Sequence, residues 1–380
     1  MVKQSIPLGR IFNIPIGLDY SWFLIFALIT WTLATGYYPA EFKNWPSSEY
    51  WITAGVTAVL FFASVLLHEL GHSVVALRYK IPVRSITLFI FGGVAQIGAE
   101  PPFATAEFWI AIAGPLVSFI LAGIFALLET VSASFSPLLA LAKYLAYING
   151  TLGLFNLIPG FPLDGGRVFR AIVWGITQNF HKANQIAATV GRAIAFIFIL
   201  VGVWQVFSGN FLGGIWIAFI GWFLESAANA QLQQQAIQDL LSGHTVSQAM
   251  NQSYTIIPSN TTIQQLADEH ILGEGRRFFI IEEMDKVLGI LTLHNIKEVP
   301  RSDWSNTTVD QRMIPADQMH RAYPDEALWD ALKMMDENGV NQVPVMEGEH
   351  MLGVLSREGV ISFLRTLQEL NQTHAPVMRA

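Results

Sequence analysis

Three residues of the sequence have the types and spacing to bind and use a metal ion: His68, Glu69 and His72, in the pattern His-Glu-Leu-Gly-His. The flanking residues SVLL and SVVAL favour a helix, which places the two histidines one turn apart on one face. Both imidazoles then reach one ion, and zinc is expected where they share an open tetrahedral site with a carboxylate. Glu69 is placed to act as general base on a metal-bound water.

The surroundings of this pattern strengthen the interpretation. The pattern lies inside an apolar stretch, 51–77, that is long enough to cross a membrane. A charged residue at the centre of a bilayer costs about 2.5 kcal/mol or more, so ionisable residues there usually indicate function. The alternative is a polar patch that faces an internal cavity and binds nothing.

A third protein ligand is needed, and Asp164 is the best candidate. It is the only carboxylate between Glu129 and Glu225, and it ends the segment Asn-Leu-Ile-Pro-Gly-Phe-Pro-Leu-Asp that begins at Asn156. The prolines and glycines here predict a broken helix whose freed polar groups can face the site. Alternatively, Asp164 caps a helix around Arg167–Trp174.

The rest of the composition predicts a membrane domain followed by a soluble acidic one. The 380 residues are 52% hydrophobic and 13% charged, without cysteine. Residues 1–230 hold 11 basic and 9 acidic residues (net +2), and residues 231–380 hold 11 and 20 (net −9). An acidic soluble part gives no support for nucleic-acid binding. Six spans are expected, near 20–38, 51–77, 108–128, 137–158, 193–208 and 211–230.

Six spans place both termini on one side of the membrane. Nine basic residues fall on the terminal side: Lys3, Arg10, Arg78, Lys80, Arg84, Arg167, Arg170, Lys182 and Arg192. Only Lys43 and Lys143 fall opposite, so the N-terminus and the soluble domain are expected in the cytosol. At 1.5 Å per residue from Arg78, His68 then lies roughly 15 Å below the cytosolic face.

Between the second and third spans, Val83–Gly98 is too short and too rich in glycine to span, and its β-branched and aromatic residues predict a hairpin that dips into the membrane. Irregular backbone at that depth has to line a cavity. The alternative is a hairpin on the cytosolic surface.

After a Gln-rich linker, 231–244, the sequence repeats itself at an offset of about 63 to 65 residues. VSQAM at 246–250 recurs as VDQRM at 309–313, and GILT at 289–292 recurs as GVLS at 353–356. Each copy predicts a small α/β unit, with helices at Thr262–His270 and Ala327–Asn338. This arrangement resembles a tandem pair of cystathionine-beta-synthase (CBS) domains.

The HExxH helix together with the later N-x-x-P-x-x-P-x-D-G segment resembles the site-2 protease family of intramembrane zinc metalloproteases, in its subgroup with a paired CBS tail. The resemblance implies an α-helical polytopic fold with about six spans and a membrane-dipping β-hairpin, one zinc ion per chain, and hydrolysis of peptide bonds in transmembrane protein substrates. It implies the following residues: His68, His72 and Asp164 as ligands, Glu69 as catalytic glutamate, Asn156 for the oxyanion, and Phe91, Gly92 and Gly93 as a hairpin that holds an extended substrate.

The expected domains are 1–230 for the membrane protease, 231–244 for the linker, 245–303 and 308–366 for the CBS pair, and 367–380 for the tail. Nucleotide-binding CBS pairs have a Ser or Thr followed three residues later by Asp. Here Thr292 is followed by Asn295, and Ser356 by Gly359. This departure weakens the expectation of adenosine-nucleotide binding and favours a platform for homodimerisation or gating.

A membrane metal or ion transporter regulated by its CBS domains is the alternative function. Such a protein needs liganding groups on several helices and no general base, whereas Glu69 lies directly beside a histidine. The plasma membrane is the expected location. Two further features have ordinary interpretations: Gly114 and Ser118 belong to a small-residue stripe for helix packing, and Arg167 and Arg170 are expected to anchor the interface. The alternative for Arg167 is that it orients the Asp164 ligand from outside the metal's own ligand set.

Overall fold

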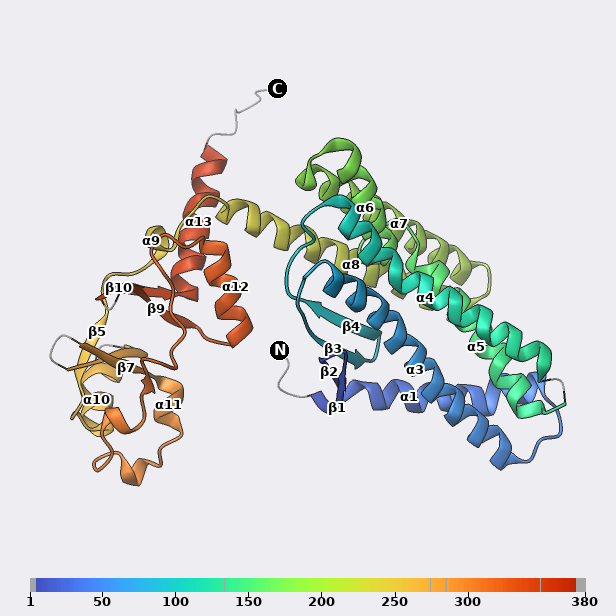
Figure 1. Ribbon diagram of the computed structural model, residues 1–380, viewed down its shortest axis with the longest axis horizontal. Coiled ribbons are helices and arrows are strands. Elements are labelled where there is room, and N and C mark those ends of the chain that lie inside the picture. The colour runs from blue at the N-terminus through green and yellow to red at the C-terminus, as the bar shows by residue number, and fades with distance from the viewer. Residues whose placement is uncertain (1–4, 133, 274, 284–285, 349, 374–380) are drawn as a thin grey trace. The chain divides into compact units, whose positions relative to one another are not determined.

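The computed structural model describes residues 5–132, 134–273, 275–283, 286–348 and 350–373. The chain divides into two compact units, Met1–Gln233 and Gln234–Ala380. The first unit is mainly long helices with one sheet, and the second is a smaller α/β unit (Figure 1).

Within the described residues, six helices are long and apolar enough to cross a membrane, which confirms the predicted number. They are Ser21–Glu41 (α1 Ser21–Thr32, η1 Leu33–Tyr37 and α2 Tyr38–Glu41), α3 Ser47–Arg78, α4 Ala104–Val131, α5 Ser136–Asn156, α7 Phe180–Phe207 and α8 Phe211–Leu241. Two bounds differ from the prediction by more than four residues: α7 begins at Phe180 rather than 193, and α8 continues through most of the expected linker. Polar residues in both places still favour helix, although they end the apolar run.

These helices expose large apolar side chains outward and pack through small ones inward. Leu127 and Phe207 are 68% and 86% exposed, as expected of surfaces that face lipid. Ala58, Ala111 and Ala187 are fully buried where helices meet. Small residues allow the close approach by which helices associate in a membrane.

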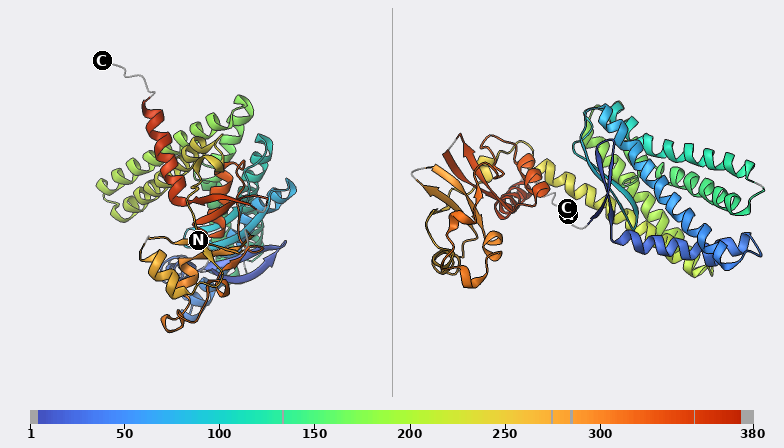
Figure 2. Two further views of the ribbon diagram at one scale, coloured as in Figure 1. Left: turned by 90° about the vertical axis from the view of Figure 1, so that its left-hand side faces the viewer. Right: turned by 60° about the horizontal axis from the view of Figure 1, so that its bottom comes forward.

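Four strands form one mixed sheet in the first unit: β1 Ser5–Ile11, β2 Ile14–Asp19, β3 Val83–Phe89 and β4 Gly92–Ile97. The β3–β4 pair is the predicted hairpin, while the first two strands were not predicted. The strands lie together beside α1 and α3 in two views of the molecule (Figures 1 and 2). Leu70 of α3 packs on Ile86 of β3, and Val65 packs on Leu88. The sheet is thereby fixed against the helix that contains the HExxH motif.

Helix α6, Asp164–Thr177, is short and follows the Pro- and Gly-rich segment 157–163 after α5, as the sequence predicts. A Cβ at Gly165 would overlap the backbone of Leu157, and one at Gly166 would overlap the backbone of Gly160. The glycines therefore allow the start of α6 to pack directly on the segment before it.

The second unit contains two sheets with helices between their strands. The first repeat has α9 Val246–Ala249, β5 Thr255–Pro258, α10 Ile263–Leu266, η2 Ala267–Ile271, β6 Phe278–Glu283, β7 Lys286–Thr292, α11 Leu293–Lys297 and η3 Arg301–Asp303. The second has η4 Val309–Gln311, β8 Ile314–Pro315, α12 Leu328–Asn338, β9 Gln342–Glu347, β10 His350–Ser356 and α13 Arg357–Thr373. Phe278, Ile280, Met346 and Val354 share one buried cluster, so the two repeats pack on each other.

Candidate metal centre

Helix α3 brings His68 and His72 together as the spacing predicts. Both side chains are buried, and their Nε2 atoms lie 3.2 Å apart. The four-residue interval is one helical turn, so both rings leave the same face of α3.

Asp164, the first residue of α6, completes the cluster. Its Oδ2 lies 3.1 Å from Nε2 of His68 and 3.1 Å from Nε2 of His72. The N-cap of α6 is Leu163, whose side chain makes no capping hydrogen bond. The Asp164 carboxylate therefore faces the histidines instead of capping its own helix.

The three atoms fit a zinc ion. They form a triangle with edges of 3.1, 3.1 and 3.2 Å. Ligands about 2.0–2.2 Å from a tetrahedral ion lie about 3.3–3.6 Å from one another, so a small expansion would admit the metal. Nδ1 of His72 lies 2.7 Å from the Ile110 carbonyl oxygen, which can only accept. The proton is therefore on Nδ1, and the Nε2 lone pair of His72 is left for the ion.

Helix α4 contacts both imidazoles. Ser118 Oγ lies 2.8 Å from Nδ1 of His68, opposite to the Nε2 that faces Asp164. A Cβ at Gly114 would overlap Nε2 of His72 and lie 2.7 Å from Nε2 of His68. The small-residue stripe with Gly114 and Ser118, which was predicted to serve helix packing, thus also contacts the two histidines. The sequence contains a signal for this, because Ile110, Gly114 and Ser118 recur at four-residue intervals.

Glu69 lies beside the histidines on the wall of a cavity of about 470 Å³. The cavity is lined from α1, α3, the hairpin, the end of α5 and the start of α6. Glu69 accepts a hydrogen bond from the backbone N–H of Ala95 in β4. A Cβ at Gly93 would lie 2.5 Å from Glu69 Cγ. The carboxylate therefore rests on the β4 strand and opens onto the same space as the metal cluster.

The remaining predicted site residues also line this cavity. Asn156 stands at the end of α5, and its Nδ2 donates to the Leu152 carbonyl at 3.1 Å. Phe91, Gly92 and Gly93 form part of the hairpin wall. Phe91 also stacks on Phe223 of α8, with ring centroids 4.9 Å apart. All the predicted site residues except His72 thus line one cavity, and His72 contacts two of them, His68 and Asp164.

Arg170 does not anchor an interface, contrary to the prediction. It is 6% exposed and forms an ion pair with Glu107, which is fully buried at the start of α4. Sequence reasoning missed Glu107 because the third span was expected to begin one residue later. The sequence does contain a signal that Arg170 faces the site: Asp164, Arg167 and Arg170 recur every three residues and so lie along one side of α6.

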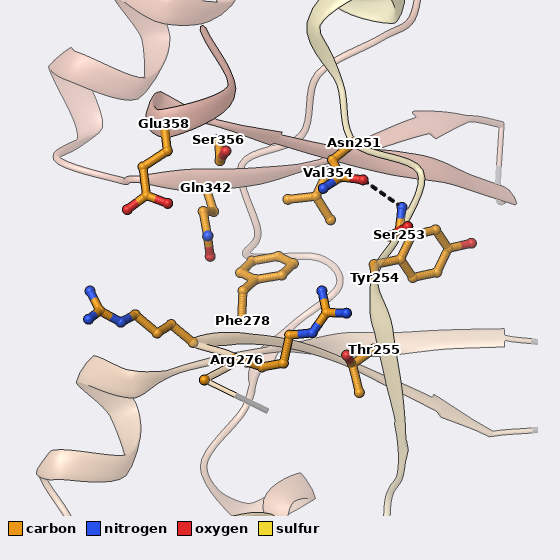
Figure 3. Close-up of a pocket in the computed structure, with 12 residues that line it drawn as sticks. Asn251, Ser253, Tyr254, Thr255, Arg276, Phe278, Gln342, Val354, Ser356 and Glu358 are labelled. Carbon is orange, nitrogen blue, oxygen red and sulfur yellow. Dashed lines mark hydrogen bonds between the residues drawn. The ribbon is translucent and has the colours of Figure 1, made fainter. Parts of the chain in front are cut away.

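A second cavity, of about 450 Å³, lies between the two CBS repeats (Figure 3). Its polar lining includes Arg276, Arg277, Gln342, Ser356 and Glu358, with the Phe278 ring beside them. Thr292 and Asn295 are not part of this lining. Thr292 Oγ1 donates to Asn295 Oδ1 at 2.6 Å, and the pair caps α11.

This fold and this cluster indicate a class of protein: an integral membrane zinc metalloprotease, with candidate metal ligands on the spanning helix α3 and on α6. The model of peptidase family M50 matches residues 56–143 and 128–198, and the CBS domain model matches 246–302 and 312–366. The chain belongs to peptidase family M50, the site-2 protease family, and has a tandem CBS tail. The predicted fold class, enzyme class and zinc cofactor are confirmed.

Relatives span the whole chain. The Synechocystis sp. protein named "Putative zinc metalloprotease sll0528" is 36% identical over 96% of this chain and 97% of its own length. Zinc metalloprotease MJ0392 of Methanocaldococcus jannaschii is 28% identical over 97% of this chain and 98% of its own length. The solved structure of the site-2 protease from M. jannaschii covers 60% of this chain and 94% of that one, at 32% identity and a TM-score of 0.42.

Proposed function

We propose that His68, His72 and Asp164 hold the catalytic zinc and that Glu69 is the general base of an intramembrane endopeptidase. The observation that carries this assignment is the 3.1 Å approach of one Asp164 oxygen to both histidine Nε2 atoms. Asp164 is 92 residues from His72 in the sequence and on a different helix, and His68 and Asp164 line the same cavity as the Glu69 carboxylate. Three ligands and an adjacent base are the parts that metal-assisted hydrolysis requires.

In the proposed reaction the ion, when bound, polarises the scissile carbonyl and acidifies the attacking water. Glu69 takes a proton from that water and passes it to the leaving amine nitrogen. Asn156 Nδ2 carries two hydrogens, of which one is donated to Leu152. The other can stabilise the negative charge that develops on the carbonyl oxygen. Ser118 and the Ile110 carbonyl hold the imidazoles in place throughout.

The proposed substrates are transmembrane proteins, and the hairpin is their proposed docking strand. Strand β4 pairs with β3 on one side only. Its Gly93 contacts Glu69, so an extended segment added along the other side of β4 would lie beside the base. A substrate helix has to unwind to bind in this way, because its carbonyls are otherwise hydrogen-bonded within the helix.

We further propose that the N-terminus and the CBS pair lie in the cytosol at the plasma membrane. The bias of basic residues toward the terminal side supports this orientation. The proposed division is a membrane domain, 1–230, a linker, 231–244, and the CBS pair, 245–366.

The CBS pair is proposed as a dimerisation or gating platform rather than an adenosine-nucleotide sensor. Thr292 and Asn295 satisfy each other as a helix cap, and Ser356 Oγ accepts from the Gly359 N–H at 3.0 Å. In the first repeat the positions that would hold a ribose are therefore used inside the fold, and in the second Ser356 lines the cavity with its hydroxyl already bonded to Gly359.

The test uses the purified full chain in detergent with a single-span membrane protein as substrate. Wild type, Glu69→Gln and Asp164→Asn are compared, each with and without a zinc chelator. Cleavage by wild type alone, lost on chelation, supports the proposal. Glu69→Gln should retain zinc, whereas Asp164→Asn should not. Cleavage that survives both substitutions contradicts it.

A further inference from the structure

One face of α4 contacts both histidines of the proposed metal centre and the helix that begins with Asp164. Glu107, Ile110, Gly114 and Ser118 follow one another at intervals of three, four and four residues, so they share this face. Ile110 and Ser118 contact the imidazoles of α3, and Gly114 packs beneath both. Glu107, one turn earlier, contacts α6 instead, the helix that begins with Asp164.

The contact between α4 and α6 is a buried network of charged groups. Glu107 is fully buried, and its Oε1 accepts a hydrogen bond from Arg170 Nε at 2.8 Å and a second from Nη2. Arg170 Nη1 donates to Asn184 Oδ1 of α7 at 2.7 Å. The guanidinium lies over the rings of Phe161 and Phe180, at 5.0 and 4.8 Å from their centroids. Arg170 is therefore held from several directions, and three helices meet at it.

Stability alone does not explain this network. Apolar side chains of similar size in place of a buried ion pair often leave a protein equally stable or more stable. Charged groups in a membrane domain usually mark function. What the pair adds is direction, because Nε and Nη2 of the rigid guanidinium both donate to Oε1 of Glu107 and so restrict how α6 can turn against α4. Arg167, one turn before Arg170, also lies 3.9 Å from Glu107 Oε1 and lines the catalytic cavity.

We propose that Glu107 and Arg170 are positioning residues that set the distance between Asp164 and the two histidines. This inference rests on the ligand set proposed above. Asp164 stands six residues before Arg170, about 9 Å along the helix, so a small rotation of α6 would move its carboxylate off the histidines. Metal sites tolerate only about 0.2 Å in ligand distance. Helix α4 thus aligns all three ligands, two by direct contact and the third through Arg170.

The experiment measures zinc affinity of the purified full chain by competition with a chromophoric chelator, together with the melting temperature of the metal-free protein. Glu107→Gln keeps the shape of the side chain and removes its charge. The paired variant Glu107→Leu with Arg170→Met removes both charges. Each is expected to bind zinc about 10- to 100-fold more weakly, the usual effect of groups that orient metal ligands. The paired variant should melt no lower than wild type. Cobalt-loaded Glu107→Gln should show altered visible bands.

Two controls separate positioning from general damage. Tyr38→Phe removes another fully buried contact, the 2.7 Å hydrogen bond to Thr57 of α3, and should leave zinc affinity within twofold of wild type. Arg170→Lys keeps the positive charge but loses the planar guanidinium that donates to Glu107 through two nitrogens. It replaces the paired variant if that one does not fold. It too should weaken zinc binding.

Asp164→Asn tests the ligand set itself. Weak zinc binding by this variant, with normal binding by the Glu107 and Arg170 variants, overturns this inference alone. Normal binding by Asp164→Asn overturns the proposed ligand set and this inference with it. Equal losses in Tyr38→Phe and Glu107→Gln would show a general structural effect and also overturn the inference.

Discussion

Gly114 of α4 lies so close to His72 of α3 that a Cβ added at position 114 would overlap the Nε2 atom of the imidazole. That nitrogen is the one that faces Asp164. An ion shared by the ligands has to occupy the same region. The missing side chain at Gly114 therefore keeps the proposed metal position open.

Gly114→Ala is expected to abolish zinc binding and peptidase activity in a folded protein. The added methyl group fills the ion's space, whereas alanine in a helix interior is favoured over glycine by about 1 kcal/mol. Metal content per chain and the melting temperature of the metal-free protein measure the two effects. Gly123→Ala is the matched control, because it lies on the same helix and has open space around its Cβ position. Normal zinc content in Gly114→Ala would contradict the assignment.

The core of the candidate site was predictable because its residues sit in local patterns. A helix places His68 and His72 on one face, and a broken helix after Asn156 leaves Asp164 as the nearby acid. The supporting residues were not predictable in the same way. Ser118 is separated from His68 by 50 residues, and their contact depends on which face of α4 packs on α3. The spacing of small residues along α4 limits which of its faces can pack on α3, but it does not identify that face.

The spanning helices were predictable because long apolar runs have few alternatives in a membrane. The strands Ser5–Ile11 and Ile14–Asp19 were missed: they pair with each other as a local hairpin, and only the second also pairs with a strand that is distant in sequence. Ile16 pairs with Ile86, and this parallel pairing is what fixes the hairpin into a sheet. The segment before Asp19 includes prolines and glycines, which hide the alternation typical of strands.

Ser118→Ala is expected to weaken zinc binding by about 10- to 100-fold, because His68 loses the partner that orients its ring. Chelator competition measures this change. Ser64→Ala is the control: Ser64 is buried on α3, one turn before His68, and its hydroxyl donates to the Leu60 carbonyl and accepts from Asn149 Nδ2 at 3.3 Å, neither of which is a proposed metal ligand. An equal loss of affinity in both variants would argue against a specific role for Ser118.

Asn156→Leu is expected to lower kcat by about 10²- to 10³-fold with zinc affinity unchanged, because an oxyanion donor acts only when charge develops. Steady-state kinetics on a membrane substrate, with metal content measured in parallel, test this. Asn149→Leu is unsuitable as a control, because Asn149 is fully buried and hydrogen-bonded to Leu145. Thr151→Val, exposed on the same helix, serves instead and should keep full activity.

Gly93→Val is expected to lose peptidase activity while retaining zinc. A Cβ here would lie 2.5 Å from Glu69 Cγ, so the larger side chain displaces the base and thickens the strand edge proposed for substrate. Val94→Ala is the comparison, since this neighbouring side chain is 46% exposed. Activity in Gly93→Val close to that of wild type would show that Glu69 does not need this contact with β4.

Thr292 and Asn295 of the CBS pair hydrogen-bond to each other at the start of α11: Asn295 Oδ1 accepts from the Thr292 N–H at 3.1 Å and from the Thr292 hydroxyl at 2.6 Å. Because these side chains cap α11, Thr292→Ala should destabilise the CBS pair by about 1 kcal/mol. Thr308→Ala should have little effect, since the Thr308 side chain makes no capping hydrogen bond. Neither ATP nor AMP should raise the melting temperature of wild type or of either variant. Micromolar binding of either nucleotide to the full chain in calorimetry would instead show that the pair senses nucleotides, and that the cap does not exclude them from the cavity lined by Arg276 and Arg277.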